Sequence, residues 1–151
     1  MMTRIPVTPR TQSGLDFARR VYPEIEQLGR LCGALEDDAK RAAQLMDPDF
    51  WKHIGENIAA LSHEIDRVIA RESLTYAETM SEDPYVTIPT QCLFFTKMLL
   101  ERASYKLVQD PDTNDGAQVV CALLTAARDR FETTFASLTR NLYPVEKPFI
   151  N

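Results

Sequence analysis

The 151-residue chain has little glycine and no long apolar run. Its five glycines are scattered along the sequence. Because sandwiches and barrels need many turns, this scarcity argues against an all-β fold. No apolar stretch approaches the length of about 18 residues that predicts a membrane span. The first ten residues also lack the apolar centre of a secretory signal peptide. We therefore expect a cytoplasmic helical protein without a membrane partner.

Cysteine and histidine are too few and too scattered for the common metal motifs. Cys32, Cys92 and Cys121 form no C-x-x-C pair, so the sequence predicts neither a zinc knuckle nor a thioredoxin-type site. Three buried, reduced thiols are the simplest interpretation, and they suit a cytosolic protein. The two histidines, His53 and His63, lie off the apolar face of their predicted helix. We therefore predict no metal site.

The motifs of common enzyme classes are also missing. The sequence has no G-x-S-x-G nucleophile elbow, no glycine-rich phosphate loop and no dinucleotide fingerprint. We accordingly predict no catalytic residue and no cofactor, and we interpret the chain as a protein that is not an enzyme.

The charge is negative, with 17 basic and 22 acidic residues and a net charge of −5. This balance opposes broad binding to phosphate backbones. The N-terminal end is an exception, because Arg4, Arg10, Arg19 and Arg20 face only Asp16 among the first twenty residues. These arginines are candidates for contact with an acidic protein or, as a less favoured alternative, with nucleic acid.

Apolar residues instead recur at alternating spacings of three and four over long stretches. Such a spacing places them on one face of an α-helix, whereas a strand needs alternation by two. The first two series are Ala18, Val21, Ile25, Leu28, Cys32, Leu35, Ala39, Ala42 and Met46, then Trp51, Ile54, Ile58, Leu61, Ile65 and Val68. A later series is Val120, Leu124, Ala127, Phe131, Phe135, Leu138 and Leu142.

Proline and turn residues set the expected helix ends. Pro23 either bends the first helix or splits it, and we favour a bend or tight joint because the apolar series continues through it. Asp47-Pro48-Asp49 is a strong helix start. The helices are expected over residues 14–46, from 47 to 72 or to 80, over 89–109 and over 117–142, with a loop over 81–88.

These elements predict an all-α fold, an antiparallel bundle of about four long helices. Pro6 and Pro9 predict an extended arm over residues 1–12. The bundle is expected over 13–143, followed by a short tail over 144–151. The spacing leaves open whether the apolar faces pair within one chain or across a dimer.

Two regions carry apolar residues that the bundle does not obviously need. The C-terminal region contains Tyr143, Phe149 and Ile150, and the tail is expected to dock either on its own bundle or on a neighbour. The third helix contains Phe94, Phe95 and Met98 on more than one face. These side chains either pack in the core or line a groove that a partner fills.

The function favoured by the sequence is that of a non-catalytic protein-interaction module: a small acidic adaptor, regulator or assembly subunit that binds protein partners or forms a homo-oligomer. One alternative is a helical subunit of a nucleoprotein or defence-related complex that contacts nucleic acid through the basic N-terminal region. A second is a metal- or ligand-binding bundle enzyme.

Overall fold

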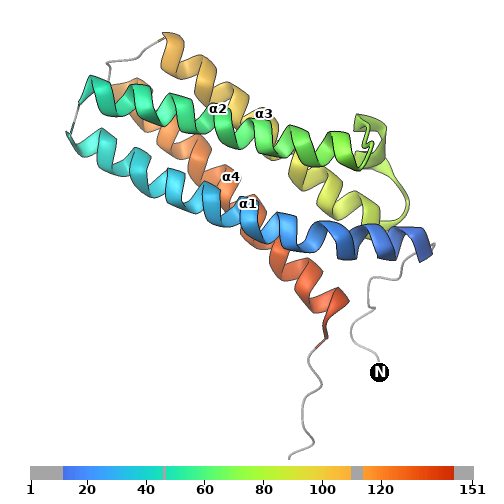
Figure 1. Cartoon of the computed structure of the whole chain (residues 1–151). Helices are drawn as coiled ribbons and strands as arrows, with labels where there is room; N and C mark the ends of the chain where they lie inside the picture. Colours follow the sequence, from blue (N-terminus) through green and yellow to red (C-terminus); the bar gives the residue numbers. More distant parts are fainter. Residues whose placement is uncertain (1–11, 46, 110–113, 145–151) are drawn as a thin grey trace, which may run out of the picture.

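Four long helices pack against one another, as the sequence predicted. The computed structural model of the chain describes residues 12–45, 47–109 and 114–144. Figure 1 shows the helices running back and forth along the bundle. They are α1 (Gln12–Leu45), α2 (Pro48–Arg71), α3 (Pro84–Gln109) and α4 (Asn114–Leu142), with a short 3₁₀ helix, η1 (Tyr76–Met80), before α3. Over the described residues the chain contains no strand.

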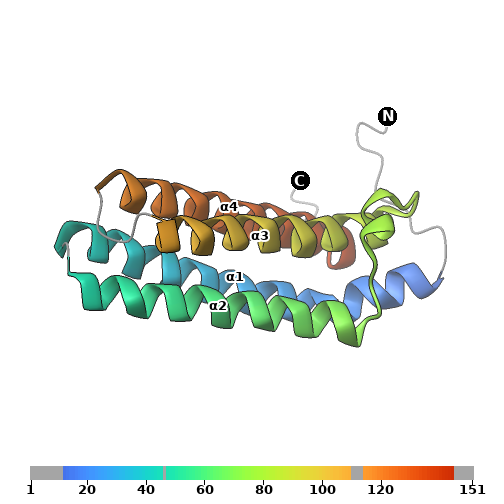
Figure 2. The same ribbon diagram turned by 90° about the horizontal axis from the view of Figure 1, so that it is seen from above.

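The helices form two layers. Seen from above, α1 and α2 lie side by side in one layer and α3 and α4 in the other (Figure 2). α1 also packs on α4 and α3, which closes the bundle around a common core. None of the helices in the described ranges is long and apolar enough to cross a membrane.

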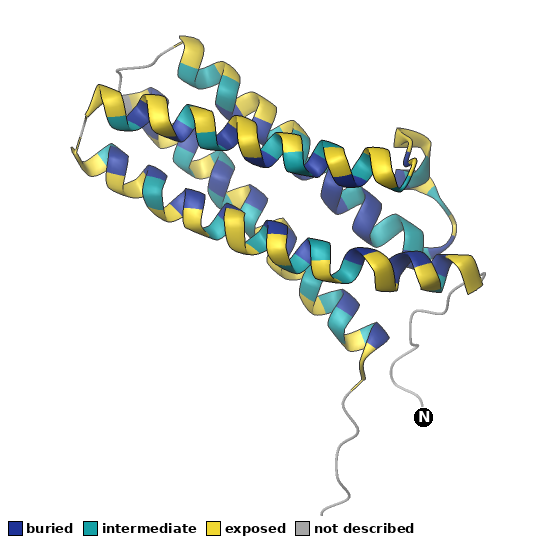
Figure 3. Ribbon diagram, viewed as in Figure 1, coloured by how far each residue is buried: buried dark blue, intermediate teal, exposed yellow. Residues whose placement is uncertain are grey.

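The predicted apolar faces form this core. Figure 3 shows buried positions along the faces that the helices turn toward one another. All the members of the second series are buried, and so are those of the first series up to Ala42. Met46 lies outside the described residues. In the last series Phe135 is only partly buried. The largest fully buried side chains include Phe131, Ile25, Ile54, Ile58, Ile65, Leu93, Leu100 and Leu124.

α1 is one continuous helix that contains Pro23. Its first turns lean away from the line of the remaining helix (Figure 2). Pro23 itself is exposed. Val21 and Ile25 on either side are fully buried, and their packing holds the helix together across the missing N–H group. The structure thus shows the bend that we favoured over a split.

α2 begins where the sequence predicted. Asp47 accepts a hydrogen bond from the backbone N–H of Asp49 at 3.0 Å, with Pro48 in the first turn. The helix ends at Arg71 and does not continue to Met80. Ser73 follows with a positive φ of 55°, a left-handed backbone conformation that ends the helix.

α3 begins at Pro84, five residues before the expected start at Pro89. The predicted loop over 81–88 is therefore confirmed only for 81–83 and was wrong for 84–88. Asp83 explains the early start. Its Oδ1 accepts a hydrogen bond from the N–H of Tyr85 at 3.0 Å, and its carbonyl accepts one from Val86. Asp83 and Pro84 together therefore repeat the Asp-Pro helix start seen in α2.

α4 begins at Asn114, three residues before the expected Ala117, and ends at Leu142 as predicted. The arm expected over 1–12 is shortened by α1, which already begins at Gln12. The remaining residues of that arm, 1–11, and the tail residues 145–151 lie outside the described residues.

Candidate protein-binding surface

A surface groove follows the seam between α3 and α4. One part, of about 500 Å³, is lined by Met98, Arg102 and Tyr105 of α3 together with Val119 and Leu123 of α4. A second part, of about 210 Å³, is lined by Phe95, Met98, Leu99 and Arg102 of α3 and by Arg130 of α4. Because both parts share Met98 and Arg102, we treat them as one surface, which we call the α3–α4 groove.

The sequence of α3 produces this groove because its apolar residues occupy two opposite faces. The core face carries Leu93, Thr96, Leu100 and Ala103, all fully buried. The groove residues Phe95, Met98, Arg102 and Tyr105 each follow a core residue by two positions. Two positions correspond to roughly 200° around a helix. The second face therefore points away from the core and leaves Met98 48% and Tyr105 65% exposed.

The end of the α3–α4 groove that contains Phe95 is aromatic. Tyr76 of η1 meets Phe94 edge-on at 5.8 Å and Phe95 at 6.4 Å between ring centroids. Gln91 donates a hydrogen bond to the carbonyl of Thr79 at 2.8 Å. This bond holds η1 against α3, beside Phe94 and Phe95.

The charged groups of the groove are mostly basic. The guanidinium of Arg130 lies 5.1 Å from the centre of the Phe95 ring, a cation–π contact. Neither Arg102 nor Arg130 forms a salt bridge within the part of the chain that the structure describes. Glu101 also lines the groove, but it lies 3.8 Å from Lys97, which pairs with Asp66 at 2.7 Å.

The structure separates the predicted partner-binding residues into three places. Phe95 and Met98 line the α3–α4 groove, whereas Phe94 is not among its lining residues and contacts Tyr76 of η1 instead. Tyr143 lies elsewhere, beside Tyr22 of α1, at 5.1 Å between ring centroids. Tyr22 also stacks on Phe135 of α4 at 4.9 Å. Tyr143 therefore extends an aromatic cluster on the α1–α4 seam. Phe149 and Ile150 lie outside the described residues.

Only part of the predicted basic cluster lies within the described residues. Arg4 and Arg10 lie outside the described residues, and Arg19 is exposed on α1. Arg20 forms a salt bridge to Glu72 at 2.9 Å.

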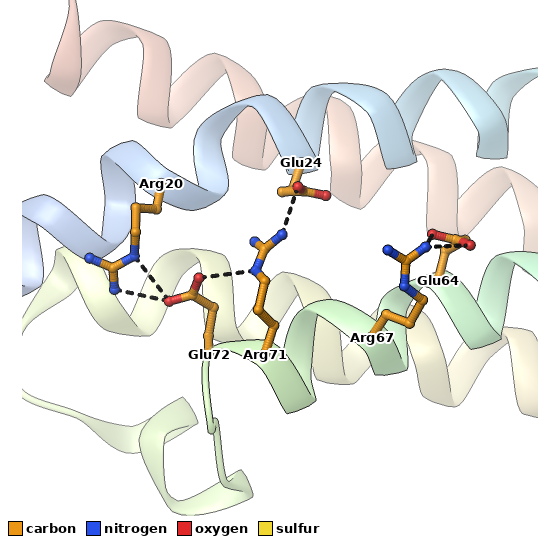
Figure 4. A network of polar contacts seen from close by, with 6 residues as sticks. All are labelled: Arg20, Glu24, Glu64, Arg67, Arg71 and Glu72. Atoms are coloured by element: carbon orange, nitrogen blue, oxygen red, sulfur yellow. Dashed lines mark hydrogen bonds and ion pairs between the residues drawn. The ribbon is translucent and has the colours of Figure 1, made fainter.

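Glu72 continues this contact into a network at the end of α2 (Figure 4). It also pairs with Arg71 at 3.3 Å, and Arg71 reaches Glu24 of α1 at 3.0 Å. Arg20 therefore helps to hold α1 against α2, and part of its charge is balanced within the bundle.

A buried glutamate that the sequence interpretation missed lies between α1 and α4. Glu36 is 1% exposed and accepts hydrogen bonds from Thr125 and from Arg128, the latter at 2.5 Å. Lys40 lies 3.2 Å away. Burial alone would raise the pKa of Glu36, but hydrogen bonds from Thr125, Arg128 and Lys40 outweigh it and lower the pKa to about 2.

This cluster is suited to holding helices together and poorly suited to proton transfer. A carboxylate with a pKa near 2 stays ionised near neutral pH and has little tendency to take up a proton. A signal was present in the sequence. Glu36 lies between the core residues Leu35 and Ala39, four positions before Lys40, and four positions place two side chains on one helix face. The partners on α4 could not be seen from that spacing.

The cysteines and histidines form no metal cluster. Cys32 and Cys92 are buried, as predicted, whereas Cys121 is only half-buried. His53 and His63 are exposed. Among the residues described, no group of three or more histidine, cysteine, aspartate or glutamate side chains is arranged to hold a metal ion.

The sequence interpretation found only part of the α3–α4 groove. Arg102, Tyr105 and Arg130 were missed, together with the α4 side chains Val119 and Leu123. The spacing of Phe95, Met98, Arg102 and Tyr105 was the available signal, since it repeats the three-and-four pattern on a second face. The α4 side of the groove could not be predicted in this way, because the spacing within one helix does not show that α4 lies beside α3.

Comparison with known proteins adds no assignment: no protein-family model, no curated protein and no solved structure matches the chain.

Proposed function

We propose that the chain is a non-catalytic protein-interaction module, an adaptor, regulator or assembly subunit, whose α3–α4 groove binds another protein. The second face of α3 carries the proposal. Met98 and Tyr105 are large apolar or aromatic side chains about half exposed or more, and they line a continuous groove with Val119 and Leu123. Single exposed apolar residues are ordinary on protein surfaces, but grouped ones are typical of binding sites.

The composition of the groove supports a protein as its ligand. Methionine, aromatic residues and arginine are enriched at protein interfaces, and the groove contains Phe95, Met98, Tyr105, Arg102 and Arg130. Covering apolar surface contributes about 25 cal/mol per Å² to binding before the entropic costs of association. The contact of Arg130 with Phe95 holds two of these side chains in place before a partner arrives.

The nucleic-acid alternative has less support. It rests on Arg4, Arg10, Arg19 and Arg20, and Arg20 is partly neutralised by Glu72. The buried Glu36 does not support the enzyme alternative, because its three hydrogen-bond donors keep the carboxylate ionised. We place the module in the cytoplasm because its three cysteines are free thiols, which suits a reducing compartment.

Site-specific photo-crosslinking tests the proposal. A benzophenone side chain is introduced at Met98 and, as the control, at exposed His63 of α2, in cells that naturally contain the protein. We expect one discrete adduct from position 98 that is absent from position 63. The crosslinked protein, once identified and purified, is expected to form a complex of defined stoichiometry with the intact chain.

The same complex provides the decisive control. The substitution Tyr105→Asp is expected to weaken it at least about tenfold, since a buried charge opposes binding, whereas His63→Asp leaves it unchanged. Adducts of equal yield from both positions, or a complex that tolerates Tyr105→Asp, would reject the α3–α4 groove as the binding site.

A further inference from the structure

We infer that the occupant of the α3–α4 groove is an amphipathic helix of a partner protein, with carboxylates beside its apolar face. This inference rests on the proposed function and specifies the partner's chemistry. The dimensions of the groove support a helix. From Phe95 to Tyr105 the groove follows eleven residues of α3, whose ten steps correspond to about 15 Å or three turns. A seam between two antiparallel helices accepts the ridge of a third helix.

The charges of the groove indicate which side chains flank the apolar face of the partner helix. Arg102 lies in the middle of the groove and Arg130 at its aromatic end. Within the described residues neither has a carboxylate partner, whereas Arg20, Arg71 and Arg128 each pair with a glutamate of the bundle. Guanidinium groups bind carboxylates through paired N–H donors. A partner that supplies aspartate or glutamate at these two points would complete their hydrogen bonding.

The stacking of Arg130 on Phe95 strengthens this argument. The ring holds the guanidinium at the groove wall, 5.1 Å from its centroid, without supplying a negative charge. An arginine that is already positioned loses less conformational entropy when it binds a carboxylate. The groove is also basic within a chain whose net charge is −5, so an acidic partner is attracted to this face and repelled by much of the remaining surface.

A second copy of the chain fits the groove less well. Two copies that met face to face would place two Arg102 and two Arg130 side chains in one interface. Glu101 is the one acidic side chain among the described residues that line the groove, and Lys97 already lies 3.8 Å from it. Like charges brought together in an interface are unfavourable. The charge pattern therefore favours a different, acidic partner.

Two synthetic helical peptides test the inference with the full chain. Both have about 18 residues, roughly five turns, and the same leucine face. One carries glutamate on both flanks and the other carries lysine. Fluorescence anisotropy is expected to show that the glutamate peptide binds at least about tenfold more tightly than the lysine peptide, with a difference that shrinks as salt is raised.

Charge reversal in the protein provides the matched test. The double variant Arg102→Glu/Arg130→Glu is expected to reverse the preference, so that the lysine peptide binds more tightly. The control variant Arg41→Glu/Lys52→Glu makes the same change in net charge at exposed positions of α1 and α2 and should keep the preference for glutamate. Circular dichroism and thermal unfolding confirm that each variant is folded.

The remaining outcomes overturn the inference. They are equal binding of the two peptides, binding of neither, or an unchanged preference in the reversed variant. A homodimer in sedimentation that dissociates on Met98→Asp would assign the groove to a second copy. The crosslinking experiment at Met98 is independent of the peptides. If it succeeds while the peptides fail, the proposed function stands and only the acidic helix is rejected.

Discussion

Arg128 of α4 donates a hydrogen bond from Nη1 to the buried carboxylate of Glu36 on α1, over 2.5 Å. Thr125 and Lys40 also contact this carboxylate, and Arg128 continues to Glu132 at 2.9 Å. The negative charge is thus surrounded by donors from two helices that are far apart in sequence. Because a buried charge without partners is very unfavourable, this cluster fixes how α4 lies against α1.

The substitution Glu36→Gln is expected to lower the free energy of unfolding at neutral pH by roughly 1–3 kcal/mol. The amide keeps the size of the side chain but removes the charge that Arg128 and Lys40 balance. The estimate is moderate because Arg128 is 37% exposed and water can solvate its guanidinium in the variant. Chemical denaturation followed by circular dichroism measures the change. A variant as stable as the wild type would show that the ion pairs do not contribute.

The stability difference between the wild type and Glu36→Gln should depend on pH. The pKa of Glu36 falls from its usual value of 4.5 to about 2 in the folded chain, so its ionised form stabilises folding above pH 4.5. That stabilisation is lost as the pH falls from 4.5 toward 2. The difference in stability between wild type and Glu36→Gln should therefore narrow over this window. A difference that stays constant down to pH 2 would contradict the lowered pKa.

Two glycines on one face of α1 should respond in opposite directions to alanine. A Cβ at Gly29 would lie 3.2 Å from the Cβ of Phe131, which is fully buried and has little room to shift. A Cβ at Gly33 would lie 3.8 Å from Arg128, an ordinary contact with a flexible side chain. Alanine is favoured over glycine in a helix by up to about 1 kcal/mol. We therefore expect Gly33→Ala to raise the melting temperature.

Gly29→Ala gains the same helix propensity but crowds Phe131, and we expect it to destabilise the fold by roughly 1 kcal/mol. The two variants share a helix and lie four residues apart, so each is the control for the other. Thermal unfolding under identical conditions measures both. Stabilisation by both substitutions would mean that α1 and α4 can separate slightly without loss.

The sequence predicted the parts of the fold that depend on one helix at a time. The faces of α1 and α2 were found because each helix buries a single regular series, such as Ile54, Ile58 and Ile65. The start of α3 was misplaced because Pro84 and Pro89 both fit a first turn, and only the contacts of Asp83 distinguish them.

The candidate site depends on contacts between helices, which spacing cannot reveal. Phe95 and Met98 were identified from the apolar excess of α3, but Arg130 belongs to the site only because α4 lies antiparallel beside α3 (Figure 1). Glu36 and Arg128 are separated by 92 residues. No local pattern connects positions that far apart, so the ion pair between them could not be predicted from the sequence.

The salt bridge between Arg20 and Glu72 should contribute little by itself. The side chain of Glu72 is only 8% exposed, but that of Arg20 is 56% exposed, so water screens the pair from the arginine side. Exposed ion pairs contribute about 0.2–1 kcal/mol. A double-mutant cycle with Arg20→Ala and Glu72→Ala is expected to give a coupling energy in that range, which decreases at high salt. A coupling well above it would show that the network through Arg71 and Glu24 acts as one cooperative unit.

The three thiols should differ sharply in reactivity. Burial raises the pKa of Cys32 and of Cys92 to about 12, and it also raises the pKa of the half-buried Cys121. Because the thiolate is the reactive form, Cys32 and Cys92 should react with a disulfide reagent at mildly alkaline pH only when the bundle unfolds. Cys121 should react first, and Cys121→Ser should remove that early phase. Two thiols that react at the same rate in the folded protein would show that the core opens locally around Cys32 or Cys92.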